Sequence, residues 1–355
     1  MLGNPSIIAV ALFFLYNKIM NSIREIGENI KDSPYFSGEV SYDVPMNEHT
    51  TMKVGGKASA YIVPHDAVSA AIVVQECKKN AVRLVVLGGG SNVVVSDDGI
   101  DGIVLSTERM NAISFCSEQK KVGLDGAPWK SGTLVRVSCG AGALMNDIVA
   151  FCASHGLWGL SCFAGLPGTA GGAAYMNARC YEKEASDVIA SVTFLNFDKI
   201  VANTDIKVAE FQEIYHNNRV DWSYKCSPFV AKNILIVGVD FYCIAVEGKD
   251  VSDVIFAKND AYVHDRIVKG HFKAPSAGSV FKNNRAFGKP SGMLVDEAGL
   301  KGFSVGGAQI TPWHGNFIIN TGTATASDVG KLVDVARERV RNMTGFVLEP
   351  EIIFI

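Results

Sequence analysis

Three polar side chains of this 355-residue chain stand out because each interrupts an apolar strand or a tight turn. Glu351 lies in the terminal run FVLEPEIIFI, where a buried carboxylate is costly without a partner. Ser279 follows Gly278 in SAGSVFKN, and Lys225 lies in the turn WSYKCSPF. A hydroxyl, an ammonium group and a carboxylate could together bind an anionic substrate and transfer a proton. Each also has a structural explanation: a salt-bridged glutamate, a turn-forming serine and a solvated lysine.

Other kinds of site find little support. No Ser-His-Asp order or Cys-His pairing emerges, and the seven histidines lack the HxxxH or HxH spacing of metal ligands, so no metal is expected. The eight cysteines form no CxxC pair, which indicates reduced thiols in a cytoplasmic protein. A net charge of −3 gives no general attraction to nucleic acid, so no nucleic-acid partner is expected.

A glycine-rich loop is the element around which the chain is organised. An apolar run at 84–87 meets three glycines, a Ser-Asn pair and a second β-branched run, a pattern that predicts strand, tight loop, strand. Consecutive glycines can take positive φ and bring backbone N–H groups close to an anion. Neither a Walker phosphate loop nor GxGxxG is present. We therefore predict a loop that holds a diphosphate, with a plain hairpin turn as the alternative.

A second glycine-rich segment, FAGLPGTAGGAAYMNARCY, covers 163–181. Its small residues would let a flat ring or a diphosphate lie against the backbone. The alternative is the ordinary start of a packed helix after Pro167. Two such segments in one chain favour a dinucleotide site.

The remaining pattern predicts the elements that position these loops. A helix over 66–80 separates two strands, which gives a β-α-β-loop-β unit with its ligand at the strand ends. Residues 110–140 read as antiparallel strands and 143–157 as an amphipathic helix. The change in character near residue 245 predicts a domain boundary there. Residues 1–19 are interpreted as a spurious or unstructured extension, with a weak membrane anchor as the alternative.

Five segments, HTT-KVGG, LGGGSN, GLPGTAGGAAYMN, GSVFKN and LEPEI, appear here in the order seen in the UDP-N-acetylenolpyruvoylglucosamine reductases, the MurB family. From Met20 on, the chain resembles that family. The resemblance implies an α+β fold: an FAD-binding region of the PCMH/vanillyl-alcohol-oxidase type at 20–244, with two α/β subdomains, and a C-terminal α+β substrate-binding domain at 245–355. The short segment between Cys243 and Ser279 resembles the family's type II.

The resemblance also implies roles for individual residues. Ser279 matches the family's proton-donating serine, and Glu351 its glutamate. Lys225 falls where the family has an arginine, and Arg179 lies in ARCYE, where the family more often has AGAYG. The implied cofactor-binding residues are Thr51, Gly88, Gly89, Gly90, Ser91, Asn92, Gly165, Pro167, Gly168, Gly171, Gly172 and Asn177. The implied substrate-binding residues are Tyr224, Lys269 and Asn283.

The activity implied by the resemblance is NADPH-dependent reduction of UDP-N-acetylglucosamine enolpyruvate through FAD, in peptidoglycan precursor synthesis. The expected partners are this small substrate and NADPH, with no stable membrane partner. Two alternatives stay open. One is another PCMH-type flavin oxidoreductase acting on a different small substrate. The other is a non-catalytic protein that binds a nucleotide sugar or a flavin, given the lysine at 225.

Overall fold

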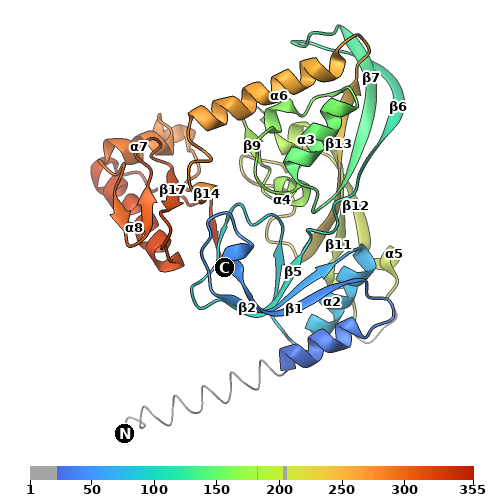
Figure 1. Ribbon diagram of the computed structural model, residues 1–355, viewed down its shortest axis with the longest axis horizontal. Coiled ribbons are helices and arrows are strands. Elements are labelled where there is room, and N and C mark those ends of the chain that lie inside the picture. Colours follow the sequence, from blue (N-terminus) through green and yellow to red (C-terminus); the bar gives the residue numbers. More distant parts are fainter. Residues whose placement is uncertain (1–21, 182, 203–205) are drawn as a thin grey trace.

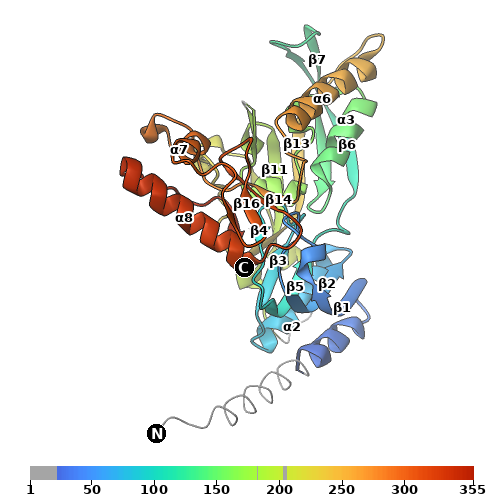
Figure 2. The same cartoon turned by 60° about the vertical axis from the view of Figure 1, so that its left-hand side comes forward.

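The structure is a computed structural model that describes residues 22–181, 183–202 and 206–355 (Figure 1). The extension expected at 1–19 lies outside the described residues. Within the described part of the chain, none of the helices combines the length and apolar composition needed to cross a bilayer. In Figures 1 and 2 the C-terminal third forms a separate body beside the earlier strands, while the C-terminus itself returns to them.

The N-terminal unit is a small α/β sheet with strand order β1-β2-β5-β3. Its elements are a helix over 22–31, β1 (Gly38–Pro45), β2 (Lys57–Pro64), α2 (Ala67–Lys79), β3 (Leu84–Leu87), β4 (Val93–Val94) and β5 (Ile100–Ser106). The helix predicted over 66–80 is confirmed as α2, which begins after Asp66 because that carboxylate accepts a hydrogen bond from the backbone of Ser69. Strands β2, β5 and β3 run parallel, so their carboxyl ends share one edge of the sheet.

The middle unit is built on an antiparallel sheet of order β12-β11-β13-β7-β6. Its elements are β6 (Ile113–Gly123), β7 (Ser131–Gly140), α3 (Met145–Ser154), β8 (Leu157–Trp158), α4 (Ala170–Tyr175), β9 (Arg179–Cys180), β10 (Lys183–Glu184), β11 (Ile189–Asn196), α5 (Val208–Phe211), β12 (Gln212–His216), β13 (Ile234–Ala245) and α6 (Val251–Val268). Apolar residues of α3 and α4 pack on this sheet in one buried cluster. The expected antiparallel strands within 110–140 and the helix within 143–157 are thus confirmed.

The C-terminal unit is a second α+β body with strand order β14-β17-β16-β15. Its elements are β14 (Ser276–Ser279), α7 (Ser291–Glu297), β15 (Ser304–Val305), β16 (Ala308–Ile310), β17 (Phe317–Asn320), α8 (Ala326–Thr344) and β18 (Ile353–Phe354). Helix α8 begins with a capping box between Thr325 and Asp328, and ends at Gly345, whose φ of 78° suits glycine.

Helix α6 lies between the middle unit and the C-terminal unit in Figure 1. Its residues Val251 and Ile255 join a buried cluster with Ala153 of α3, so α6 packs on the middle unit. The domain boundary predicted near residue 245 remains a prediction, and this packing favours a boundary nearer residue 270, after α6.

The end of the chain runs between the N-terminal and C-terminal units. Strand β18 pairs in parallel with β4, with Ile353 opposite Val93. The strand predicted over the terminal run is confined to these two residues. The predicted order of strand, loop and strand is confirmed as β3, the loop at 88–92 and β4. The alternative of a plain hairpin turn is wrong, because β3 pairs with β5 whereas β4 pairs with the chain end. Figure 2 shows the C-terminus beside β3 and β4.

Two side chains fix the C-terminal unit to the N-terminal one. The Asp97 carboxylate accepts hydrogen bonds from the backbone N–H groups of Ala326 (2.7 Å) and Ser327 (2.9 Å), the first residues of α8. The Asn320 amide donates to the carbonyl oxygen of Lys53 (3.1 Å) and to that of the preceding residue. The free N–H groups at the start of α8 therefore find their acceptor in the N-terminal unit, and the side chain at the end of β17 finds its acceptors there as well.

Candidate active site

A pocket of about 1480 Å³ lies where the three units meet. Its walls come from the loop at 88–92, the segment at 166–172, the turn at Lys225, the region from 265 to 279 and the chain end at Glu351. Small-molecule pockets usually measure ~300–1,000 Å³, so this one has room for a dinucleotide and a second ligand.

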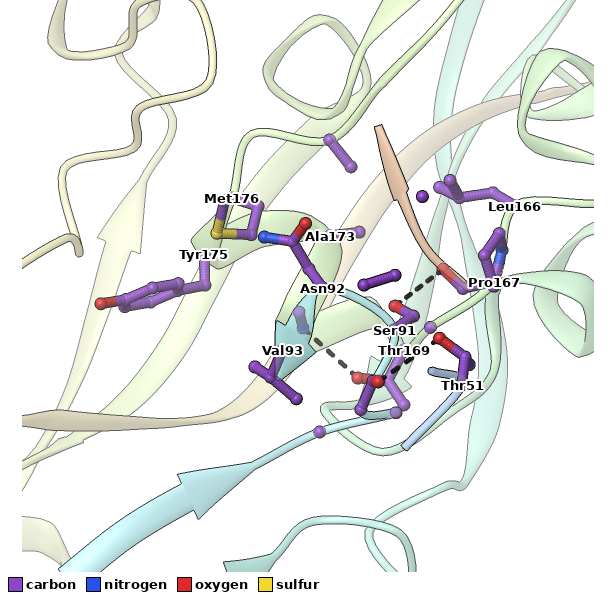
Figure 3. A pocket seen from close by; sticks show the side chains of 18 of the residues that line it. Thr51, Ser91, Asn92, Val93, Leu166, Pro167, Thr169, Ala173, Tyr175 and Met176 are labelled. Carbon is purple, nitrogen blue, oxygen red and sulfur yellow. Dashed lines mark hydrogen bonds between the residues drawn. The ribbon is translucent and has the colours of Figure 1, made fainter. Parts of the chain in front are cut away.

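The first wall is the loop at 88–92. In the described part of the chain, no acceptor takes hydrogen bonds from the backbone N–H groups of Gly89, Gly90, Ser91 and Asn92. Four consecutive free donors form a site suited to phosphate oxygens. Gly89 must be glycine because a Cβ there would lie 2.8 Å from the Cα of Gly168. Figure 3 shows the resulting contact, in which the Ser91 hydroxyl donates to the Pro167 carbonyl oxygen over 3.3 Å.

The second wall is the segment that leads into α4. The Thr169 hydroxyl accepts a hydrogen bond from the N–H of Gly172 (3.3 Å) and so starts the helix (Figure 3). A Cβ at Gly171 would lie 2.9 Å from the Cβ of Ala141, so only glycine lets α4 approach the sheet this closely. Gly168 has φ of 106°, a conformation that favours glycine. The predicted glycine segments therefore form two facing walls of one pocket.

The Lys225 Nζ lies 2.5 Å from the Glu351 Oε1, and both side chains are largely buried, with 14% and 9% exposed. A two-residue turn closed by Ser223 and Cys226 presents Lys225, whose φ is 56°. The partner that a buried Glu351 requires is thus the lysine of the WSYKCSPF turn.

Ser279 lines the same pocket, and the backbone explains how it comes close to Glu351. The N–H of Glu351 donates to the carbonyl oxygen of Val280 (2.7 Å), the residue that follows Ser279. The Asn92 amide donates to the carbonyl oxygen of Glu351 (3.0 Å). The three predicted polar side chains are therefore brought to one pocket, beside the first glycine loop.

Three of the expected binding residues, Gly165, Asn177 and Tyr224, are not among the described residues that line the pocket, and their binding roles stay predictions. Asn177 is fully buried behind the wall, where its amide donates to the Ser223 carbonyl oxygen (2.9 Å) and to Glu184 (3.1 Å). Gly165 packs on Arg266, with which a Cβ would clash at 2.8 Å. Tyr224 precedes Lys225 in the turn, and its hydroxyl accepts a hydrogen bond from the N–H of Asn283 (3.4 Å), which does line the pocket. These three residues support the wall.

The other expected binding residues, Thr51, Lys269 and Asn283, line the pocket. The Thr51 hydroxyl donates to the Ser276 carbonyl oxygen (2.6 Å) and joins the first unit to β14. The Lys269 ammonium lies 2.6 Å from the Asp265 carboxylate one helical turn earlier. The Asn283 side chain accepts from the N–H of Ser291 (2.9 Å) at the start of α7.

The pocket is strongly cationic. Among the residues that the structure describes, six cationic side chains line it against two side-chain carboxylates, those of Asp265 and Glu351. The six are Arg179, Lys225, Lys232, Arg266, Lys269 and Lys273. A concave surface with this excess of positive charge attracts ligands that carry phosphate and carboxylate groups.

Several lining residues were not predicted from the sequence. Burial and the cations nearby, Arg266 foremost, lower the pKa of His271 from its usual 6.5 to about 4, so this ring is neutral at pH 7. His271 stacks on Phe317 with ring centroids 5.0 Å apart. The Arg266 guanidinium donates to the carbonyl oxygen of Ala164 (3.0 Å). The sequence carries no motif that marks these residues. The last turns of α6 carry Arg266 to the pocket, the segment after α6 carries His271, and β17 carries Phe317.

The described residues contain no group of three or more His, Cys, Asp or Glu side chains placed to hold a metal ion. The free N–H groups of the first loop, the flat glycine wall and the cationic lining do fit a dinucleotide such as FAD. Fold and pocket together are those of a dinucleotide-binding protein, with a hydroxyl, an ammonium group and a carboxylate in the lining of the pocket.

Comparison with known proteins identifies the family. Residues 58–199 match the FAD binding domain family, and residues 270–355 match the family described as UDP-N-acetylenolpyruvoylglucosamine reductase, C-terminal domain. The UDP-N-acetylenolpyruvoylglucosamine reductase of Treponema denticola is 40% identical over 344 residues, which cover 94% of this chain and 98% of that protein. The reductase of Treponema pallidum is 38% identical, over 88% of this chain and 92% of its own length.

A solved structure agrees with these relatives. The crystal structure of UDP-N-acetylenolpyruvylglucosamine reductase (MurB) from Thermus caldophilus superposes with a TM-score of 0.65 at 27% identity, covering 90% of this chain and 100% of that chain. The chain belongs to the UDP-N-acetylenolpyruvoylglucosamine reductase family. The predicted fold class, a PCMH-type FAD-binding domain followed by a C-terminal α+β domain, is confirmed.

Proposed function

We propose that this protein catalyses the NADPH-dependent reduction of UDP-N-acetylglucosamine enolpyruvate to UDP-N-acetylmuramate, a precursor of peptidoglycan, in the cytoplasm. The observation that carries the proposal is the convergence of Ser279, Lys225 and Glu351 on one pocket beside the 88–92 loop. Relatives that are named for this reduction and align over almost the whole chain support it.

FAD, held by the two glycine walls, would supply the hydride chemistry, which no amino-acid side chain provides. The free N–H groups at 89–92 would bind its phosphates, and the flat surface at Gly171 and Gly172 would leave room for a planar ring. The Ser91 and Asn92 side chains stand beside these donors and link them to the second wall and to the chain end.

Reduction of the enolpyruvyl double bond places negative charge on the carbon next to the substrate carboxylate. An ammonium group fixed near that carbon stabilises this charge more in the transition state than in the ground state. Lys225 is the cation that the pocket offers for this purpose, and its ion pair with Glu351 fixes its position. The Ser279 hydroxyl donates the proton that completes the product, since a nascent enolate is a strong base.

The other cationic side chains of the lining would bind the part of the substrate outside the enolpyruvyl group. Lys269 and Asn283 face the pocket from the C-terminal side of α6 and from the segment before α7, where they could contact a sugar diphosphate. Tyr224 contributes through the turn that holds Lys225, and its hydroxyl accepts a hydrogen bond from the N–H of Asn283 (3.4 Å).

The decisive experiment follows the colour of the purified protein under anaerobic conditions. A yellow protein that NADPH bleaches and that UDP-N-acetylglucosamine enolpyruvate then recolours would establish the reductase. A protein that is bleached but never recoloured would favour a flavin oxidoreductase with a different substrate. A colourless protein that takes up no FAD would favour a binding protein without redox activity.

A further inference from the structure

Arg179 is a second cation close to Lys225 in the pocket wall. It belongs to β9, it lines the same pocket as Lys225 and Ser279, and 32% of its side chain is exposed. Its guanidinium carbon lies 5.9 Å from the centre of the Tyr224 ring, and Tyr224 is the residue before Lys225. Arg179 therefore lies against the turn that presents the proposed catalytic lysine.

Lys225 by itself is poorly suited to hold a carboxylate in one orientation. Its ammonium is a compact point charge, and it is already 2.5 Å from the Glu351 Oε1. A guanidinium offers two parallel N–H donors that match the two oxygens of a carboxylate. Within the described residues the Arg179 Nη2 has no acceptor, so this group has donors to spare.

Arg179 makes two long contacts, from its Nε to the Tyr181 carbonyl oxygen (3.4 Å) and from its Nη1 to Glu184, and Glu184 keeps other partners without it. The Glu184 carboxylate is almost fully buried, and the contact from the Arg179 Nη1 to its Oε1 is long, at 3.4 Å. The other oxygen, Oε2, accepts from Arg219 (3.0 Å) and from the Asn177 amide (3.1 Å). Glu184 would therefore stay paired if Arg179 turned toward a ligand, and no buried charge would be left without a partner.

We propose that Arg179 binds the carboxylate of the enolpyruvyl group through its planar fork, while Lys225 stays on Glu351 and stabilises the charge that develops next to that carboxylate. The inference rests on the proposed function and assigns to this chain a substrate-binding arginine on β9. It also divides two tasks, orientation and charge stabilisation, between two cations.

The test uses the FAD-loaded protein and two ligands that differ only in the enolpyruvyl group. For Arg179→Gln, the Kd of UDP-N-acetylglucosamine enolpyruvate, measured from the reoxidation of reduced enzyme, should rise roughly 10- to 100-fold, the range for a lost charged hydrogen-bond pair. The Kd of UDP-N-acetylglucosamine, which lacks the carboxylate, should stay unchanged, as should bleaching by NADPH. Arg179→Lys keeps the charge without the fork and should fall between wild type and Arg179→Gln.

Arg219→Lys is the matched control, because it keeps a cation beside the same Glu184 carboxylate and Arg219 is not among the described residues that line the pocket. It should leave the affinity for both ligands unchanged. Equal weakening of both ligands in Arg179→Gln, or no weakening of either, would overturn the inference. A wild-type enzyme that the enolpyruvyl substrate does not reoxidise would instead overturn the proposed function, and the inference with it.

Discussion

The backbone N–H of Glu351 donates a 2.7 Å hydrogen bond to the carbonyl oxygen of Val280, so the residue with this carboxylate lies next to the end of β14, which carries Ser279. The same carboxylate reaches the Lys225 ammonium in the middle unit. Each unit contributes to this arrangement, since Asn92 of the N-terminal unit holds the Glu351 carbonyl oxygen. The site exists only when all three units are docked.

Removal of the Ser279 hydroxyl should affect the two half-reactions differently. In Ser279→Ala, bleaching by NADPH should stay near the wild-type rate, while reoxidation by substrate should slow roughly 10²- to 10⁴-fold, because the proton donor is missing. Stopped-flow absorbance of the flavin measures both rates. The exposed Ser154 hydroxyl, at the end of α3, offers a control in Ser154→Ala. Equal loss of both rates in Ser279→Ala would make Ser279 a structural residue.

Breaking the Lys225–Glu351 ion pair should lower both the free energy of unfolding and the activity. Lys225→Met leaves a buried carboxylate unpaired, at a cost of about 3–5 kcal/mol in the free energy of unfolding. The double variant Lys225→Met/Glu351→Gln should recover much of this loss without recovering activity. Urea unfolding of the four proteins in the cycle measures the coupling; additive effects would show that the pair contributes nothing to stability.

Lys225→Arg should retain activity, since it keeps the charge and adds the donors that suit a carboxylate. We expect an unchanged or lower KM for the substrate. An inactive variant with an intact flavin spectrum would contradict the role assigned to Lys225. This substitution also bears on Arg179, because an arginine at 225 should make Arg179→Gln less harmful than it is in the wild-type background.

His271 should make stability depend on pH in the acid range. Its folded-state pKa, about 4, lies below the ordinary value of 6.5, so the folded protein binds fewer protons than the unfolded chain between these two values. The contribution is fully present above about pH 6.5 and is lost as the pH falls toward 4. In His271→Phe, which keeps a ring beside Phe317, Tm should decline less over this window than in wild type.

The exposed His264 supplies the control for that measurement. In His264→Phe the dependence of Tm on pH should match that of the wild-type protein. Identical pH profiles for His271→Phe and wild type would contradict the assignment to His271 and point to the neighbouring His314, whose pKa burial also lowers.

Asp97 should stabilise the docking of the C-terminal unit. Asp97→Ala removes the acceptor for two N–H groups at the start of α8 and should cost about 1 kcal/mol in the free energy of unfolding. Asp98→Ala, one residue along and exposed, should cost less. Because Asp97 belongs to the N-terminal unit, its loss should also weaken retention of FAD, which dialysis against FAD-free buffer would measure.

Local patterns were enough to predict much of the fold. Helix α2, strands β6 and β7 and helix α3 lie where the sequence predicts them. Each was predictable because its hydrophobic periodicity is carried by residues close together in the sequence. The two glycine segments were recognised for the same reason. The pairing of β4 with β18 was not, since nothing in either short run specifies a partner at the other end of the chain.

The candidate site was predictable to the same extent. The polar residues that break apolar or turn patterns, Ser279, Lys225 and Glu351, do reach one pocket. The sequence could not show that Asn177 lies behind the wall, because its partners Ser223 and Glu184 are brought to it only by folding. His271 was missed since its environment is created by neighbours on other elements.

The placement of β18 between the two units has a consequence for synthesis of the protein. Translation proceeds from the N-terminus, so the glycine loops emerge and can fold well before Glu351 leaves the ribosome. A nascent chain that lacks its last few residues has both walls of the pocket but not the strand beside β4. A chain truncated before Ile353 should therefore retain FAD less tightly than the protein with β18 in place.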